Sequence, residues 1–162
     1  MGKVNAAINM IAALSEKKPN LLINFGTAGA IKTGLADIVE VGQSVQCEMD
    51  ARPLGIALGA TAFETETERF TLSDSPIICG TAVRFVTSAP ELACDLVDME
   101  LYELAKIAKH EQIPLKSFKF ISDNADDSSH QDWKNSLPDA ASGFLSIQDD
   151  LFSNQTKILI LN

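Results

Sequence analysis

The sequence predicts an α/β fold, in which a sheet of buried strands is covered by helices. Residues 21–25 (LLINF) are a continuous apolar run, as expected for a strand covered on both faces. Apolar residues recur at helical spacing before this run and again in residues 101–108. Residues 118–121 indicate a second short buried strand, and the chain turns abruptly polar directly after it.

Composition narrows the class of protein. A chain of 162 residues, 46% of them hydrophobic, fits one globular domain spanning residues 1–162. The formal net charge of −9 argues against a nucleic acid or a membrane surface as partner, because both bind basic patches. No apolar run approaches the ~20 residues of a membrane span. We interpret Cys47, Cys79 and Cys94 as free thiols in a reducing cytoplasm. Without a CxxC or HxxxH pattern, we expect no metal and no cofactor.

The first half of the chain is expected to hold a helix and two strands. The helix covers residues 4–14 and ends before Pro19. After the first strand, residues 26–29 (GTAG) are interpreted as a loop that lets a ligand approach the backbone, or equally as a plain strand-to-loop turn. Residues 39–49 alternate in polarity, which predicts a long strand with one buried face and a bend or bulge at Gly42.

The middle of the chain is less regular. Residues 50–75 show no clear period, and we expect a long excursion that acts as a flap or an oligomer contact. The acidic alternation at residues 64–68 is interpreted as a solvated strand face. Residues 76–79 start another short strand. Residues 88–91 (SAPE) have the form of a capping box, which predicts a helix beginning there.

An amphipathic helix is predicted over residues 101–108, and Asp98 and Glu100 flank its start. In isolation these two acids are explained as first-turn residues that the helix dipole stabilises. A further helix is expected from Ser128 or Ser129, carrying Trp133 and broken near Pro138. The apolar residues 157–161 (KILIL) predict a terminal strand.

Asp123 is the first candidate for a chemical role. It lies two residues beyond the last apolar side chain of its strand, where ligands bind in open α/β sheets. Asp126 and Asp127 are close enough in sequence to raise its pKa by repulsion, which would allow it to donate a proton. The alternative is an acidic loop that only caps the next helix.

Four motifs occur together in an order typical of one family: GKVNAA at residues 2–7, NFGTAGA at 24–30, VDME at 97–100 and ISDNAD at 121–126. The sequence resembles the purine/uridine phosphorylase superfamily, and within it the hydrolytic methylthioadenosine/S-adenosylhomocysteine nucleosidases. The resemblance covers residues 2 to about 137. It implies a three-layer α/β/α fold around a mixed, partly closed sheet, usually assembled as a homodimer.

The resemblance also implies a reaction, the hydrolysis of the N-glycosidic bond of a purine (thio)ribonucleoside. Asp123 would protonate the departing base at N7, and Ser122 would orient Asp123. Glu100 would accept hydrogen bonds from the ribose hydroxyls and favour the developing positive charge.

Other positions are implied to contact the nucleoside. Phe85 would stack on the purine, the backbone of Val86 would bind its edge, and Met99 would pack against the sugar. The residues that would border the ribose and the attacking water are Thr27, Ala28 and Gly29. Plain core packing is the alternative for Met99 and Phe85.

The sequence also departs from the family pattern. Relatives carry a first strand and a glutamate-rich turn before the GKVNAA helix, and one of those glutamates activates the water. This sequence starts at Met1 within that helix, so we expect slow hydrolysis unless another carboxylate substitutes. No basic residue is visible near residues 26–29, which favours water over phosphate as the acceptor. A phosphorylase, a nucleotide nucleosidase and a shortened non-catalytic nucleoside-binding relative remain as alternatives.

The tail at residues 156–162 (TKILILN) is similar to the family's first strand, displaced to the other end of the chain. Short apolar strands are common, so a chance likeness is the favoured interpretation. Parallel pairing of KILIL with LLINF would instead favour a displaced strand.

Overall fold

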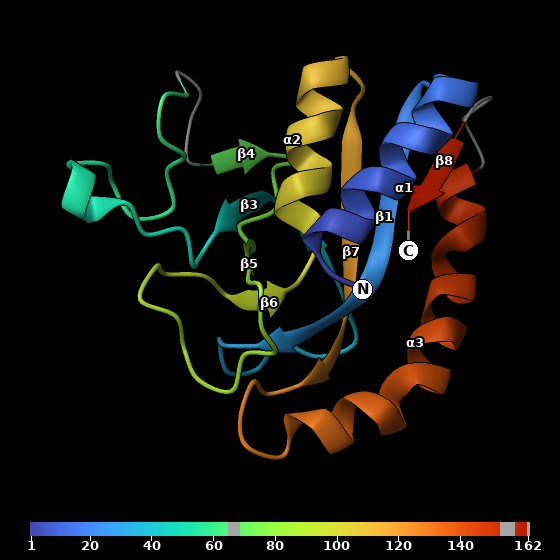
Figure 1. The fold of residues 1–162 in the computed structure, drawn as a ribbon. Helices are drawn as coiled ribbons and strands as arrows, with labels where there is room; N and C mark the ends of the chain where they lie inside the picture. Colours follow the sequence, from blue (N-terminus) through green and yellow to red (C-terminus); the bar gives the residue numbers. More distant parts are fainter. Residues whose placement is uncertain (65–68, 153–157, 162) are drawn as a thin grey trace.

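The computed structural model describes residues 1–64, 69–152 and 158–161. Along the chain it contains helices, strands and one short 3₁₀ helix (Figure 1): α1 (Lys3–Glu16), β1 (Leu21–Ala30), β2 (Ile38–Val41), β3 (Gln43–Gln46), η1 (Arg52–Leu54), β4 (Arg69–Thr71), β5 (Ile78–Thr81), β6 (Leu96–Asp98), α2 (Leu101–Glu111), β7 (Leu115–Asp123), α3 (Ser129–Phe152) and β8 (Ile158–Leu161).

The strands form one mixed sheet in the order β2-β7-β1-β6-β5-β3-β4, and β8 pairs with β1 outside this path. β1 runs parallel to β7 and antiparallel to β6. β2 and β3 are separated by a single residue, yet β2 lies beside β7 and β3 lies beside β5. The sheet therefore curls back on itself, which confirms the mixed, partly closed sheet that the resemblance implied.

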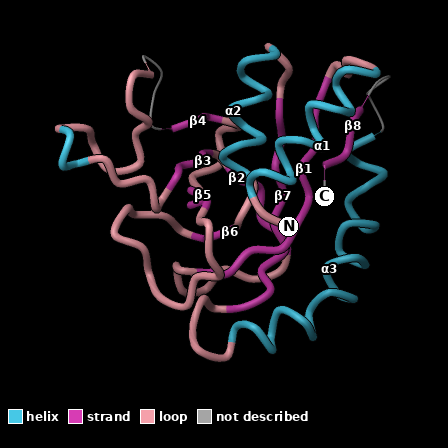
Figure 2. Tube along the Cα trace, in the orientation of Figure 1, coloured by secondary structure: helices cyan, strands magenta, loops and turns pink. Residues whose placement is uncertain are grey.

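Helices cover both faces of the sheet, because successive residues of a strand point to opposite faces. Leu22 of β1 packs in the main core cluster with Met10 of α1 and Leu104 of α2. Phe25, three residues along, turns to α3, where its ring lies 4.6 Å from that of Phe144. Figure 2 shows α1 and α2 side by side and α3 apart from them. The predicted three-layer α/β/α arrangement is confirmed.

The alternating segment at residues 39–49 is two strands rather than one. Gly42 separates β2 from β3, and a Cβ on Gly42 would lie 1.7 Å from the carbonyl oxygen of Ser75, so only glycine fits there. The predicted bend is confirmed. The predicted single buried face is wrong, because Ser44 and Gln46 are buried together with Val45. β3 pairs along both edges, with β4 and β5, and α2 packs against it.

The loop predicted at residues 26–29 is wrong, because β1 continues through this segment to Ala30. Gly26 lies opposite Lys119 of β7 and Ala28 lies opposite Ile121, with a shift of register directly after Ala28. The partner strand therefore satisfies backbone groups that a loop would leave to solvent or to a ligand.

The helix predicted to begin at Ser88 is also wrong, since residues 88–95 are irregular. In a capping box Glu91 would reach back to the helix start. Here its carboxylate binds the Arg52 guanidinium, with Oε1 2.5 Å from Nη1. The chain then enters β6, which pairs with β5 and β1. The predicted helix over residues 101–108 is present as α2.

α3 begins at Ser129, as predicted, but it does not break at Pro138. Proline inside a helix removes one hydrogen bond and bends the helix, and α3 is visibly curved in Figure 1. It is 24 residues long. Among the helices that the structure describes, none combines the length and hydropathy needed to cross a bilayer.

β8 pairs in parallel with the start of β1, so that Leu21 lies opposite Ile158 and Asn24 lies opposite Leu161. This pairing supports a displaced strand over the chance likeness favoured from the sequence. Residues 153–157 and 162 of the tail lie outside the described residues. The same holds for Glu66 and Glu68 of the acidic alternation, whose solvated strand face stays a prediction.

Candidate active site

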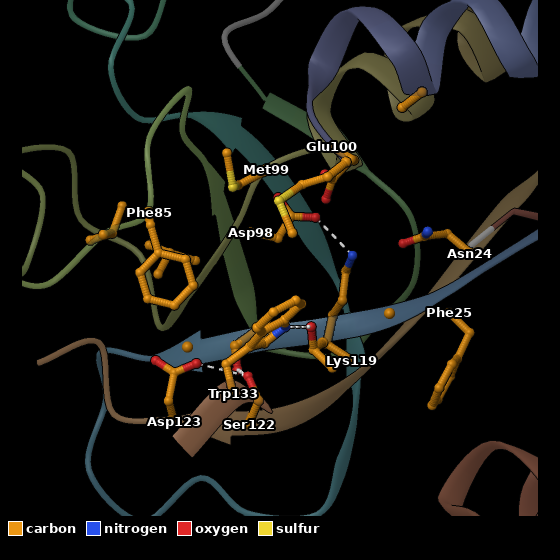
Figure 3. Close-up of a pocket in the computed structure, with 18 of the residues that line it drawn as sticks. Asn24, Phe25, Phe85, Asp98, Met99, Glu100, Lys119, Ser122, Asp123 and Trp133 are labelled. Atoms are coloured by element: carbon orange, nitrogen blue, oxygen red, sulfur yellow. Dashed lines mark hydrogen bonds and ion pairs between the residues drawn. The ribbon is translucent and has the colours of Figure 1, made fainter. Parts of the chain in front are cut away.

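A cavity of about 250 Å³ lies where β1, β6 and β7 approach their carboxyl ends (Figure 3). β1 contributes residues 24–29 to its wall, and β6 with the turn after it contributes residues 97–100. β7 contributes Lys119, Ser122 and Asp123, while Met1, residues 84–86 after β5, and residues of α1 and α3 complete the lining. The cavity lies beside the carboxyl ends of the parallel strands β1 and β7, where α/β proteins bind ligands.

Every residue predicted to act on a nucleoside lines this one cavity: Asp123, Ser122, Glu100, Met99, Phe85, Val86, Thr27, Ala28 and Gly29. In Figure 3 Ser122 and Asp123 lie along one side, and Met99 and Glu100 lie along the other. The Phe85 side chain is 37% exposed. Neither Phe85 nor Met99 belongs to the described core clusters, and their contact with a nucleoside stays a prediction.

Asp123 ends β7 and is held by two neighbours. Its Oδ2 accepts a hydrogen bond from the Ser122 hydroxyl at 2.8 Å, and its Oδ1 accepts one from the Ala125 N–H at 2.9 Å. The Ser122 hydroxyl also lies 3.3 Å from the carbonyl oxygen of Ala28. Its single hydrogen serves one of these acceptors at a time. When Asp123 is protonated, Ser122 can accept from it and donate to Ala28 instead.

Gly29 leaves room for the Asp123 carboxyl group. A Cβ at this position would lie 2.6 Å from Asp123 Oδ1 and 3.3 Å from the Ala125 side chain. The second glycine of the GTAG segment is thus required by a neighbouring side chain rather than by a turn.

Asp126 takes the capping role that was the alternative interpretation of the acidic loop. Its Oδ1 accepts hydrogen bonds from the N–H and hydroxyl of Ser128, at 2.9 and 2.8 Å. These bonds lower the pKa of the Asp126 carboxyl group. The capping function at the start of α3 falls to Asp126, while Asp123 faces the cavity.

Glu100 is the N-cap residue of α2. Its Oε1 accepts a hydrogen bond of 2.6 Å from the backbone N–H of Gly2, the N-cap residue of α1. The starts of two helices therefore meet at this carboxylate, and both helix dipoles favour its negative charge. Gly2 has φ 93°, a conformation that favours glycine.

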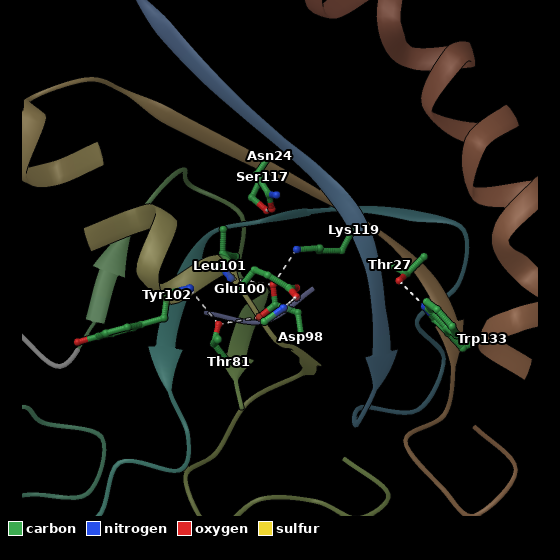
Figure 4. Close-up of polar contacts among 11 residues, drawn as sticks. Asn24, Thr27, Thr81, Asp98, Glu100, Leu101, Tyr102, Ser117, Lys119 and Trp133 are labelled. Atoms are coloured by element: carbon green, nitrogen blue, oxygen red, sulfur yellow. Dashed lines mark hydrogen bonds and ion pairs between the residues drawn. The ribbon is translucent and has the colours of Figure 1, made fainter. Parts of the chain in front are cut away.

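Lys119 and Asp98 form a buried ion pair at the cavity wall (Figure 4). The Lys119 ammonium donates to Asp98 Oδ2 at 2.7 Å, and the lysine is 1% exposed. Burial alone lowers the pKa of Lys119, but the adjacent Asp98 carboxylate outweighs it and the pKa lies above its ordinary value.

Asp98 also accepts hydrogen bonds from Thr81 Oγ1 at 2.6 Å and from the Leu101 N–H at 3.0 Å. Thr81 Oγ1 in turn accepts from the Tyr102 N–H at 2.9 Å. Together the Asp98 carboxylate and the Thr81 hydroxyl satisfy the first backbone donors of α2.

The sequence-based expectation of no basic residue near residues 26–29 is wrong. Lys119 lies opposite Gly26 in the sheet, and a Cβ on Gly26 would be 3.5 Å from the ammonium nitrogen. The two positions are far apart in sequence and meet only through strand register. The available clue was a lysine within the apolar run of a buried strand.

Trp133 and Asn24 also line the cavity, although the resemblance assigned neither of them a role. The Trp133 indole N–H donates to Thr27 Oγ1 at 2.9 Å, and Asn24 Oδ1 accepts from Ser117 Oγ at 2.9 Å. Both residues line the cavity, as do Asn5 and Asn9 of α1. Trp133 lies in the helix that follows the Asp123 strand, and no local pattern distinguishes it from a core residue.

No cluster of three or more potential metal ligands occurs in the residues that the structure describes.

Comparisons with known proteins agree with this picture. No family model matches the chain. A curated 5′-methylthioadenosine/S-adenosylhomocysteine nucleosidase from Haemophilus ducreyi is 29% identical over 168 positions, which cover 87% of this chain and 72% of that protein. The nucleosidase of the same name from Baumannia cicadellinicola is 26% identical over 163 positions, covering 85% of this chain and 71% of its own.

Solved structures share the fold. The nucleosidase from Neisseria meningitidis, in complex with methylthio-immucillin-A, superposes with a TM-score of 0.78 and 22% identity, covering 88% of this chain and 73% of its own. Futalosine hydrolase of Helicobacter pylori gives a TM-score of 0.83 at 20% identity, covering 94% and 77%. The resemblance expected from four motifs is confirmed: in sequence and in fold, this chain is similar to the methylthioadenosine/S-adenosylhomocysteine nucleosidases, a family that belongs to the purine/uridine phosphorylase superfamily.

Proposed function

We propose that this protein is a nucleosidase that hydrolyses the N-glycosidic bond of a purine (thio)ribonucleoside, such as methylthioadenosine or S-adenosylhomocysteine. One observation carries the proposal: residues from four motifs that lie far apart in the sequence line a single cavity beside the carboxyl ends of β1 and β7. The nucleosidase names of its sequence relatives support the same reaction class.

In the proposed reaction the bond between ribose C1′ and purine N9 breaks, and its electron pair passes into the base. Asp123 gives its proton to N7 of the leaving purine, and Ser122 holds the carboxyl group in place. A water oxygen then bonds to C1′ and loses a proton to solvent, and Asp123 takes up a proton from solvent to complete the cycle. Glu100 accepts hydrogen bonds from the ribose hydroxyls, and its charge favours the cation-like sugar. Phe85, Val86 and Met99 enclose the base and sugar.

Water is the acceptor we favour over phosphate, because the cavity offers no excess positive charge. Among the described lining residues the two cationic side chains are both paired, Lys119 with Asp98 and Arg84 with Glu48. Glu100 and Asp123 add further carboxyl groups to the wall. A phosphate dianion would meet neutralised cations and like charge.

We expect this protein to hydrolyse the nucleoside slowly, given the carboxyl groups that line the described cavity. Among its described lining residues the carboxyl groups belong to Asp98, Glu100 and Asp123. Asp98 already accepts three hydrogen bonds, and Asp123 is proposed to protonate the base. Of these three residues, Glu100 is therefore the one left to assist the attacking water.

The proposal is tested by incubating the protein with methylthioadenosine and measuring released adenine, with and without phosphate. We expect release that phosphate does not accelerate, and a loss of about 10²–10⁴-fold in Asp123→Asn, the usual worth of general acid catalysis. Dependence on phosphate would indicate a phosphorylase. Calorimetric binding of adenine without any release would indicate a non-catalytic nucleoside-binding protein.

We further propose that residues 1–162 act as one nucleoside phosphorylase-like domain in a homodimer. The support for a dimer is an apolar stripe on α1, where Val4, Ile8 and Ile11 are 71%, 60% and 57% exposed. A cytoplasmic location is proposed from the three cysteines, which are all free thiols.

A further inference from the structure

We propose that the buried Lys119–Asp98 ion pair is a positioning element that holds Glu100 in place across the cavity from Asp123. Its role is recognition of the ribose and not of the base. This inference rests on the function proposed above and adds to the site two residues to which the motifs assign no role.

The pair crosses the sheet beneath the cavity. β1 lies between β7, which carries Lys119, and β6, which carries Asp98. Lys119 lies opposite Gly26, and its ammonium reaches past this residue to Asp98. The ammonium passes close to the backbone of Gly26, since a Cβ at this position would lie 3.5 Å from it. One ion pair thus links the strand that bears Asp123 to the turn that bears Glu100 (Figure 3).

Asp98 also holds the turn at residues 98–102 in place through hydrogen bonds. Its carboxylate binds the Leu101 N–H and the Thr81 hydroxyl, and that hydroxyl binds the Tyr102 N–H. Glu100 lies between these fixed points as the N-cap residue of α2. Moving Asp98 would therefore shift the backbone from which Glu100 extends into the cavity.

The charge of Lys119 is what keeps Asp98 in this position. The side chains of Asp98 and Lys119 are 0% and 1% exposed, so neither charge is solvated by bulk water. A buried carboxylate without a counter-charge is strongly destabilising, whereas removing both charges together is often tolerated. This difference separates a positioning role from a merely structural one.

The test compares Lys119→Met, Lys119→Arg and the double variant Lys119→Met/Asp98→Asn. The matched control is Lys116→Met, which makes the same change at an exposed position of the same strand. Binding is followed by the fluorescence of Trp133, the single tryptophan of the chain and a cavity residue. The ligands are adenine and a carbon-linked, non-hydrolysable analogue of methylthioadenosine. Thermal unfolding is recorded for each variant.

We expect Lys119→Met to weaken binding of the analogue about 10–100-fold, the scale of a lost charge-assisted contact, while adenine binding changes less than about threefold. Lys119→Arg should retain most analogue affinity. The double variant should recover the melting temperature lost in Lys119→Met but not the affinity for the analogue.

Recovery of analogue affinity together with melting temperature in the double variant would show a merely structural pair and overturn the proposal. So would an equal loss for adenine and analogue, or a parent protein that binds the analogue no better than adenine. These readouts need no turnover. A parent that discriminates the ribose but releases no adenine from methylthioadenosine would overturn the proposed hydrolysis while leaving the role of the pair intact.

Discussion

At the scale of single residues, the site depends on glycine as well as on functional side chains. Gly29 makes room for the carboxyl group of Asp123, whereas a Cβ on Gly26 would make only an ordinary contact of 3.5 Å with the Lys119 ammonium. Both glycines lie inside a paired strand, where glycine normally weakens packing. The presence of Gly29 in β1 is explained by the Asp123 carboxyl group of β7.

Gly29→Ala should therefore impair catalysis more than folding. The new methyl group would lie 2.6 Å from Asp123 Oδ1, so the carboxyl group must move. We expect adenine release to fall by about 10²-fold or more, since small misplacements of a catalytic group cost this much. Gly26→Ala on the same strand is the comparison, because its Cβ makes an ordinary contact of 3.5 Å with the Lys119 ammonium. An equal loss in both variants, measured as kcat, would contradict this explanation.

Much of the site was predictable from residue identity, because Asp123 and Glu100 lie in short motifs that can be recognised in the local sequence. Lys119 was not predictable in this way. Its partner Asp98 is on another strand, and its neighbour Gly26 is matched to it only by the register of β1 with β7. Register is set by the whole sheet and cannot be read from one segment.

At the scale of elements, α1 and α2 contact each other through an ion pair that uses only one of the two carboxylate oxygens. Lys3 of α1 lies 3.4 Å from Glu103 Oε1 of α2, while Glu103 Oε2 is buried without a hydrogen-bond partner among the described residues. Burial raises the pKa of Glu103, and the nearby Lys3 ammonium only partly opposes the shift. The Glu103 carboxyl group is therefore protonated more readily in the folded protein than in the unfolded chain.

A pH dependence of stability follows for Glu103. A carboxyl group whose pKa is raised on folding stabilises fully below its unfolded pKa of 4.5, and this contribution is lost as the pH rises through the folded pKa. Glu103→Gln lacks that titration, so we expect it to be more stable than the parent at pH 7, by about 1 kcal/mol or less after solvent screening, and equal to it near pH 4.

Urea unfolding of Glu103→Gln at both pH values checks this expectation. Glu16→Gln on the exposed surface of α1 is the matched control and should show no such pH-dependent difference. A variant that is less stable than the parent at pH 7 would mean that the Lys3 pair outweighs the cost of burial.

Some helices and strands are determined by their local sequence, and others by contacts with distant parts of the chain. α1 and α2 were predicted from periodicity, because an amphipathic helix needs only local sequence to be recognised. The capping box at residues 88–91 failed because Glu91 binds Arg52, a contact between distant parts of the chain. The extent of β1 was missed for the same reason, since β7 pairs with residues 26–29. In both segments, contacts with residues distant in the sequence determined the local structure.

At the scale of the whole molecule, α1 presents an apolar stripe to solvent. Val4, Ile8 and Ile11 recur at spacings of four and three, which places them on one face of the helix. Large exposed apolar patches on a monomer mark interaction sites. Because α1 also lines the cavity through Asn5 and Asn9, a partner seated on this stripe would lie next to the nucleoside site.

Ile8→Asp should convert the proposed dimer to a monomer. Burying an unpaired carboxylate in an apolar interface is costly, and we expect dimer affinity to fall by at least about 10²-fold. Sedimentation velocity measures the change. Leu145→Asp on α3, where the leucine is 66% exposed, is the control and should leave assembly unchanged. A parent that sediments as a monomer at micromolar concentration would refute the dimer.

The pairing of β8 with β1 has a consequence for how the protein is made. Leu21 emerges from the ribosome long before its partner Ile158 is synthesised. Until then the start of β1, residues 21–24, has no strand along the edge opposite β7, and an unpaired apolar strand edge invites association with other chains. Nascent chains halted before residue 158 should accordingly bind chaperones and be protease-sensitive, and should lose both properties once residue 161 has cleared the exit tunnel.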